Sequence, residues 1–257
     1  MRHVTAPVGV RFAYRVVGEG TPIVMVHGAG SGSWSFDLVR PHLTDRFSTW
    51  TVDRRGRGES GDGNPYAIEA EFDDVATVMR EAGPGALLFG HSYGALVAAG
   101  AAARLDGLPA LALYEAPMGG VLADEAWAER FESHVEAGDR DVAMSDFMSD
   151  VGGYSDEEIE AMKGTPAWRA RLEVAHTVPR ELHEERGFST ADLRLGELAA
   201  PTLLLIGSRS PSWAHRSTEA FAAAIPRAEV RTLEGHGHGA SVSAPELLAS
   251  ELGQFLG

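Results

Sequence analysis

The pentapeptide Gly-His-Ser-Tyr-Gly at residues 90–94 places a serine between two glycines at the spacing Gly-x-Ser-x-Gly. The apolar residues 86–89 before it predict a buried strand, and the alanine-rich residues 95–99 after it predict a helix. A serine on such a sharp strand-to-helix turn projects its hydroxyl above the edge of a sheet, where glycines relieve the crowding of the backbone. Ser92 is therefore the candidate nucleophile.

A serine nucleophile needs a base that removes its proton and a third group that orients this base. Residues 235–239, Gly-His-Gly-His-Gly, follow the last predicted strand and bring two imidazoles to the edge of the sheet. His238 holds the histidine position of a Gly-x-x-His pattern and is the expected base, with His236 as its neighbour. A metal bound by the two histidines is disfavoured, because no carboxylate or third histidine follows at ligand spacing.

Residues 27–30, His-Gly-Ala-Gly, come directly after the predicted strand 22–26. An oxyanion hole requires backbone N–H groups that are aimed at the developing negative oxygen, and such a loop supplies them. The N–H groups of Ala29 and Tyr93 are the expected pair, the second because it follows the nucleophile in the chain.

Apolar runs that alternate with helical patterns predict an α/β fold, with a mostly parallel sheet covered by helices on both faces. The predicted strands are residues 8–17, 22–26, 48–52, 86–89, 108–114, 202–206 and 229–233. A helix is predicted from the spacing of four apolar residues on one face, namely Ile68, Phe72, Val75 and Met79. The last helix is expected to begin with a capping box at residues 243–246, Ser-Ala-Pro-Glu.

Residues 117–200 break this alternation, because they are acidic and helix-like and are interrupted by glycines. We interpret them as a helical lid inserted into a core made of residues 1–116 and 201–257. Ligands of parallel sheets bind at the carboxyl ends of the strands, and the insertion is expected to cover that edge.

The composition is that of an ordinary globular protein, with 44% hydrophobic and 23% charged residues. A formal charge of -15 argues against nucleic acid or an anionic membrane surface as a partner. The expected partner is a small-molecule substrate. The absence of cysteine excludes disulfides, thiolate catalysis and cysteine metal sites. No signal peptide or membrane span is predicted, so the expected location is the cytoplasm.

Four segments together resemble the α/β-hydrolase superfamily over essentially the whole chain. They are residues 27–30, residues 53–60 (Asp-Arg-Arg-Gly-Arg-Gly-Glu-Ser), residues 90–94 and residues 235–238. The resemblance implies a lid at 117–200, a structural role for Asp53 and catalysis without a cofactor.

The chain departs from the family at the usual position of the triad acid. In the family this acid follows the strand that corresponds to residues 202–206, but Ser210 stands there and no carboxylate is near it. Glu115 ends the preceding strand, where haloalkane dehalogenases carry their acid, and a carboxylate at a buried strand end needs a partner. Glu115 is therefore the expected acid, in the chain order Ser92, Glu115, His238.

A serine nucleophile excludes the epoxide hydrolases and dehalogenases of this fold, which need a carboxylate at that position. The triad predicts hydrolysis of an ester, thioester, lactone or amide through an acyl-enzyme. Two alternatives remain open from sequence: a lyase, cyclase or carbon–carbon bond hydrolase, and a ligand-binding protein without catalysis. Large apolar residues near the motifs predict a pocket for a small apolar substrate; they are Trp34, Met118, Phe147, Trp168 and Trp213.

Overall fold

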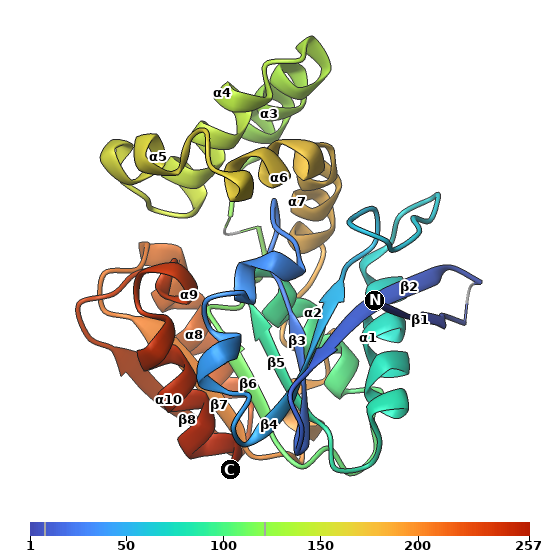
Figure 1. The fold of residues 1–257 in the computed structure, drawn as a ribbon. Coiled ribbons are helices and arrows are strands. Elements are labelled where there is room, and N and C mark those ends of the chain that lie inside the picture. Colours follow the sequence, from blue (N-terminus) through green and yellow to red (C-terminus); the bar gives the residue numbers. More distant parts are fainter. Residues whose placement is uncertain (8, 121) are drawn as a thin grey trace.

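The computed structural model describes residues 1–7, 9–120 and 122–257. Within these residues, eight strands form one sheet in the order β1-β2-β4-β3-β5-β6-β7-β8 (Figure 1). β1 and β2 are antiparallel to their neighbours, and the pairs from β4 to β8 are parallel. The strands are β1 (Arg2–Thr5), β2 (Arg11–Val17), β3 (Thr21–Val26), β4 (Phe47–Asp53), β5 (Leu87–His91), β6 (Leu111–Tyr114), β7 (Thr202–Gly207) and β8 (Ala228–Leu233).

Helices cover both faces of the sheet, as the sequence predicts. The side chains of β3 alternate, with Val24 and Val26 in one apolar cluster and Ile23 and Met25 in the other. The first cluster is covered by α1 (Ile68–Ala82), α2 (Tyr93–Ala102) and α8 (Ser212–Ala224), and the second by α10 (Pro245–Leu256). Burial on both faces explains why the central strands are continuous apolar runs in the sequence.

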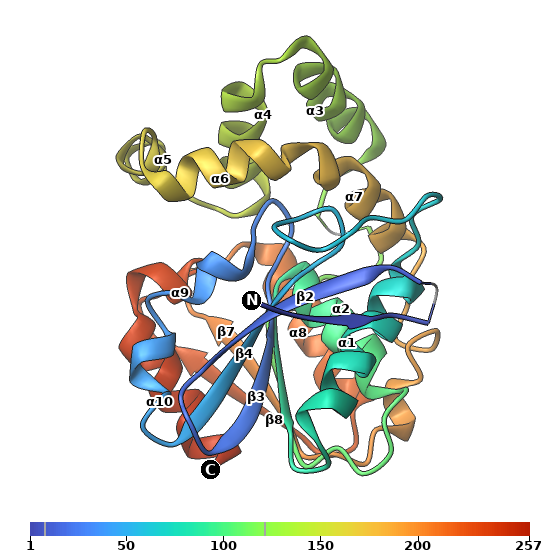
Figure 2. The same ribbon diagram turned by 45° about the vertical axis from the view of Figure 1, so that its right-hand side comes forward.

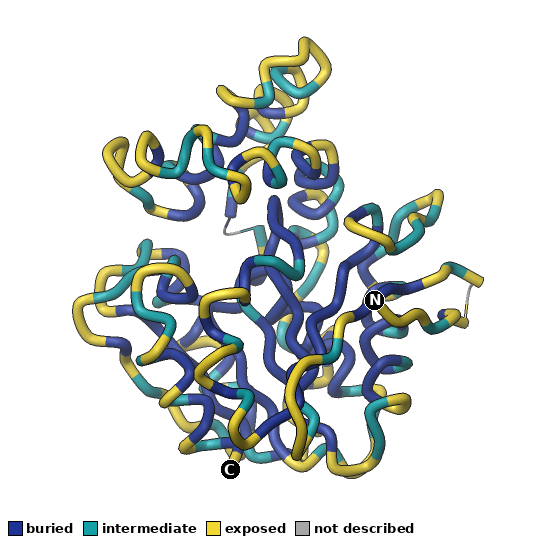
Figure 3. The backbone as a smooth tube through the Cα atoms, viewed as in Figure 1, coloured by how far each residue is buried: buried dark blue, intermediate teal, exposed yellow. Residues whose placement is uncertain are grey.

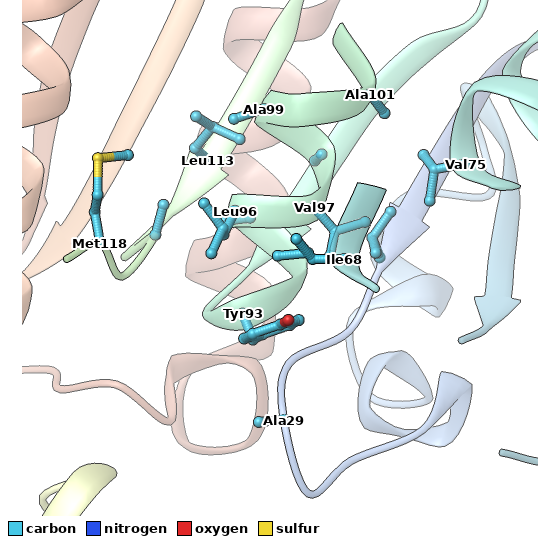
Figure 4. Packing of buried hydrophobic residues seen from close by; sticks show 14 of the residues in the cluster. Ala29, Ile68, Val75, Tyr93, Leu96, Val97, Ala99, Ala101, Leu113 and Met118 are labelled. Atoms are coloured by element: carbon cyan, nitrogen blue, oxygen red, sulfur yellow. The ribbon is translucent and has the colours of Figure 1, made fainter. Parts of the chain in front are cut away.

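Helix α2 lies wholly inside the protein, and each of its ten residues is buried. Its side chains Leu96 and Val97 project into the core around Leu113 and Ile68 (Figure 4). A Cβ atom on Gly100 would lie 2.5 Å from the ring of Phe72 on α1, so only glycine permits this close approach of the two helices. The helix that follows the candidate nucleophile is thus held rigidly from several sides.

Five α-helices occur in the described residues between β6 and β7. They are α3 (Glu125–Ala137), α4 (Arg140–Asp146), α5 (Asp156–Met162), α6 (Pro166–Val174) and α7 (Val178–Arg186). Figures 1 and 2 show them gathered at one end of the sheet, and Figure 3 shows their outer surfaces exposed. Local signals start several of them, such as the capping box of Ser155 and Glu158 and the Thr165 cap before Pro166. The domain boundaries 1–116, 117–200 and 201–257 stay a prediction.

The structure corrects some details of the sequence interpretation. Strand β1 was not expected, and the strand predicted over 8–17 begins at Arg11, with residue 8 outside the described residues. Helix α10 begins at Pro245 but has no capping box, because Ser243 ends the short helix α9 (Ala240–Ser243) and donates to the Gly239 carbonyl at 3.3 Å. Across the described residues, no helix is both long enough and apolar enough to cross a membrane.

Candidate active site

Ser92 lies at the turn between β5 and α2 with φ 56° and ψ -131°, a backbone conformation that L residues rarely adopt. A Cβ atom on Gly94 would lie 2.3 Å from the carbonyl oxygens of Val26 and His27, and one on Gly90 would lie 2.4 Å from the Gly94 oxygen. The glycines on both sides of the serine are therefore required by the packing of backbone against backbone. The turn presents Ser92 at the carboxyl end of β5, as a nucleophile on this type of turn requires.

Glu115 and His238 contact each other although they are 123 residues apart. Glu115 follows β6 in a left-handed conformation with φ 52°, and its side chain is buried. His238 Nδ1 lies 2.5 Å from Glu115 Oε2, whereas Glu115 Oε1 accepts hydrogen bonds from the Gly207 N–H at 2.8 Å and from the Ser210 hydroxyl. One carboxylate oxygen thus binds the imidazole while the other is anchored to the turn after β7. With Nδ1 engaged, Nε2 is the ring nitrogen that is left for proton transfer.

A second buried histidine supports the loop that carries His238. His91 Nε2 donates to the His238 carbonyl at 2.9 Å, and the two rings lie 4.7 Å apart. Burial lowers the pKa of His91 well below its ordinary value, so this imidazole is neutral at pH 7. The Tyr114 hydroxyl donates to the carbonyl of Gly237 in the same loop. The sequence analysis assigned no role to His91, because a histidine inside the serine motif carries no signal of what its side chain contacts.

The two candidate bases of the sequence analysis have different surroundings. His238 is buried and lines a cavity together with Ser92. His236 is half-exposed, and within the described part of the chain its side chain makes no hydrogen bond, although its backbone carbonyl accepts from the Arg209 N–H at 2.9 Å. This difference supports His238 as the base.

The cavity at Ser92 has a volume of about 40 Å³ and is enclosed by two parts of the chain. Residues at the ends of β3, β5 and β8 and in the loops after them form one side, and residues between β6 and β7 form the other, including the apolar side chains Phe147, Met148 and Val151. A larger cavity of about 260 Å³ shares Gly152, Tyr154 and His238 with it. The segment between β6 and β7 therefore covers the carboxyl ends of the strands at Ser92.

Two of the predicted substrate residues contact this region. Phe147 lines the cavity. Trp213 packs its ring against that of His238, with the centroids 5.2 Å apart, and its indole N–H donates to the Val151 carbonyl at 2.8 Å. Trp213 therefore fixes both the imidazole and the apolar wall of the cavity.

The other three predicted substrate residues lie elsewhere. Trp34 is half-buried beneath the Arg171 guanidinium, and Met118 lies in the apolar core. Trp168 is buried, and its indole N–H donates to the Asp141 carboxylate at 2.7 Å. None of the three lines the cavity in the described residues, and a contact with substrate stays a prediction for each.

The loop after β3 approaches the nucleophile closely. A Cβ atom on Gly28 would lie 2.9 Å from Cβ of Ser92, and Ala29 lines the cavity. Tyr93 is the first residue of α2, so its N–H has no acceptor within the helix. Neither the Ala29 N–H nor the Tyr93 N–H donates to an acceptor in the described residues. Both are therefore available to a ligand oxygen.

Arg54 holds the loop after β3 and is itself fixed by buried ion pairs. The Arg54 guanidinium donates to the carbonyls of His27 and Gly28 at 3.4 and 3.2 Å. It also forms ion pairs of 2.7 Å with Glu71 of α1 and with Glu181 of α7. Asp53 has the structural place that the resemblance implies, since its carbonyl accepts from the Ser60 hydroxyl at 2.5 Å.

Glu181 links the inserted helices to the core, because its Oε1 also lies 2.5 Å from Nη2 of Arg57. We expect Glu181→Gln to lower the free energy of unfolding by about 3 kcal/mol, since breaking a buried ion pair leaves charge uncompensated. The value lies at the low end of such losses because Arg54 keeps Glu71, and Arg57 keeps its 2.7 Å hydrogen bond to Thr177.

Urea unfolding followed by circular dichroism measures this loss. The exposed Glu132 of α3 offers a control, and Glu132→Gln is expected to change the stability by less than about 0.5 kcal/mol. Equal stabilities for the two variants would show that the ion pairs of Glu181 contribute nothing.

Comparison with known proteins shows the family to which the chain belongs. The model of the Alpha/beta hydrolase family matches residues 23–251. The chain belongs to this family. An alpha/beta hydrolase from Sphaerobacter thermophilus superimposes with a TM-score of 0.84 and 31% identity over 100% of both chains. The pimeloyl-[acyl-carrier protein] methyl ester esterase of Stenotrophomonas maltophilia is 28% identical over 94% of this chain and 95% of its own.

Other relatives of this alpha/beta hydrolase match over a shorter span. The aligned part covers about a third of the length of two curated hydrolases. The more similar is the 2-(acetamidomethylene)succinate hydrolase of Mesorhizobium japonicum, with 39% identity over 37% of this chain and 34% of that one.

Proposed function

We propose that this alpha/beta hydrolase is a serine hydrolase that cleaves an ester, thioester or lactone with an apolar part through an acyl-enzyme. The observation that carries the proposal is the 2.5 Å contact between His238 Nδ1 and Glu115 Oε2, in a cavity that Ser92 and His238 line together. The apolar side chains of the inserted helices around this cavity support an apolar part in the substrate. The relative named as a methyl ester esterase supports an ester as the reacting group.

In the proposed first half-reaction, Ser92 Oγ attacks the substrate carbonyl carbon while His238 Nε2 takes the hydroxyl proton. Glu115 stabilises the imidazolium that forms, and the N–H groups of Ala29 and Tyr93 bind the oxyanion. The tetrahedral intermediate collapses when the bond to the leaving group breaks and the imidazolium protonates that group. Its product is an ester between Ser92 and the acyl group.

In the second half-reaction, His238 Nε2 takes a proton from a water molecule, which attacks the acyl carbon. The bond to Ser92 Oγ then breaks, and the imidazolium returns the proton to the serine. The carboxylic acid leaves and the free enzyme is restored. Apart from the water molecule, both proposed half-reactions use only side chains and backbone groups of the chain.

A fluorophosphonate probe tests this proposal, since it phosphonylates an activated serine. We expect stoichiometric labelling of the protein at Ser92, no labelling of Ser92→Ala and full labelling of Ser189→Ala, a variant at an exposed serine. p-Nitrophenyl butyrate is expected to release a burst of p-nitrophenol that Ser92→Ala lacks. Folded protein that stays unlabelled would exclude the serine mechanism.

A further inference from the structure

The Arg171 guanidinium on α6 is buried beside the candidate nucleophile. The residue is 9% exposed and lines the cavity that contains Ser92. Its Nη1 donates to the Gly30 carbonyl at 3.0 Å, and its guanidinium carbon lies 5.0 Å from the ring centroid of Trp34. One carbonyl acceptor and one aromatic face therefore orient the group, while the remaining N–H donors have no hydrogen-bond acceptor in the described residues.

The other buried arginines differ from Arg171, because each of them has a carboxylate partner. Arg54, Arg55 and Arg57 each form an ion pair with a buried carboxylate at 2.5–2.7 Å. No such pair occurs at Arg171 with any carboxylate in residues 1–7, 9–120 and 122–257. Burial lowers the pKa of its guanidinium, although arginine remains charged in proteins. A buried cation without a counter-ion is costly, and a bound anion would repay that cost.

The cavity itself favours an anion over a cation. Its lining contains no aspartate or glutamate in the described residues, although the chain has 37 acidic residues. Ser35 also lines it, and the Ser35 hydroxyl is buried without a hydrogen-bond partner in that part of the chain. Two independent polar side chains thus border one small space, and each has hydrogen-bonding capacity that the described residues do not use.

We propose that Arg171 and Ser35 form a subsite for a carboxylate of the substrate. The inference rests on the proposed function, because the carboxylate would bind next to the ester that Ser92 attacks. The cavity of about 40 Å³ is smaller than such a substrate, so its walls have to move when the substrate binds. The substrate class is then a short ester, thioester or lactone that carries a carboxylate beyond its reacting carbonyl. The planar guanidinium suits a carboxylate, which accepts two parallel N–H bonds, and the apolar walls contact the carbons between the two ends.

Matched esters test the subsite through a ratio of rates. The monomethyl esters of glutaric and adipic acid carry the carboxylate, and the dimethyl esters of the same acids lack it. We expect wild type to have the higher kcat/KM on the monomethyl esters. Arg171→Met is expected to lower the ratio of the two kcat/KM values by about 10- to 100-fold, the usual effect of one charged hydrogen-bond pair. Arg171→Lys is expected to retain part of the ratio.

Arg169 gives the matched control, because it lies on the same helix and is exposed. Arg169→Met is expected to keep the wild-type ratio. An Arg171→Met ratio equal to that of wild type would overturn the proposal, as would a wild type that prefers the dimethyl esters.

A binding measurement separates failure of the subsite from failure of the proposed hydrolysis. Calorimetric titration of Ser92→Ala with glutarate is expected to show binding that the double variant with Arg171→Met loses. Binding of glutarate without hydrolysis of any ester would retain the subsite and reject the proposed function. Hydrolysis of the monomethyl and dimethyl esters at similar rates, without glutarate binding, would reject the subsite and retain the proposed function. Inorganic phosphate that binds more tightly than glutarate would overturn the assignment to a carboxylate.

Discussion

The variant His238→Ala is expected to lose about three or more orders of magnitude in kcat, whereas His236→Ala keeps most of the activity. Without its base, a serine hydrolase retains only the oxyanion hole and substrate binding. His238 lines the cavity with Ser92 and is held by Glu115 at 2.5 Å, while His236 is half-exposed. The two residues are two positions apart in a glycine-rich loop, so each serves as the other's control for damage to that loop.

Steady-state rates with p-nitrophenyl butyrate check this expectation, with circular dichroism to show that both variants are folded. His238→Ala is also expected to lose labelling by the fluorophosphonate probe, since the serine is no longer activated. A larger loss for His236→Ala than for His238→Ala would reverse the assignment of the base.

Glu115→Gln is expected to keep the fold and to lower kcat by about 10²- to 10⁴-fold. The amide has nearly the shape of the carboxylate, but it cannot stabilise an imidazolium, and its NH₂ group favours the tautomer of His238 that carries the proton on Nε2. Glu115 Oε1 already accepts two hydrogen bonds, from Gly207 and Ser210, which hold an amide in the same position.

Ser210→Ala provides the comparison. It removes one hydrogen bond to Glu115 while the Gly207 N–H keeps the same oxygen at 2.8 Å, so we expect a loss in kcat of less than about tenfold. Rates for both variants on one ester, measured from pH 6 to 9, separate the two roles. If Glu115→Gln stays within tenfold of wild type while Ser210→Ala is the more damaging, Glu115 is not the triad acid.

Local patterns in the sequence were enough to predict seven of the eight strands in the described residues, the serine turn and the loop 27–30. Each of these depends on apolar runs and glycines within a few residues. The position of Glu115 at the end of a buried strand also predicted where its carboxylate lies, because the carboxyl ends of parallel strands meet at one edge. Its 2.5 Å contact with His238 agrees with that expectation.

Such local patterns could not predict contacts between segments that are distant in the sequence. Ser210 was interpreted only as the residue that replaces an acid, whereas its hydroxyl binds the carboxylate of Glu115. Arg171 lies among other charged residues of an amphipathic segment, and nothing in that pattern distinguishes a buried arginine from an exposed one such as Arg169. The difference arises only when α6 packs over the loop at Gly30.

The ion pairs of Glu181 restrict how the protein admits a substrate larger than its cavity. Helix α7 is tied to Arg54 and Arg57, whereas residues 147–154 form no ion pair with the core in the described residues. Opening is therefore expected to occur at residues 147–154, where it breaks the 2.8 Å hydrogen bond from the Trp213 indole to the Val151 carbonyl, while α7 stays in place. Such a movement would widen the entrance while Arg54 continues to hold the carbonyls of His27 and Gly28, so the proposed oxyanion site stays assembled when the cavity is open.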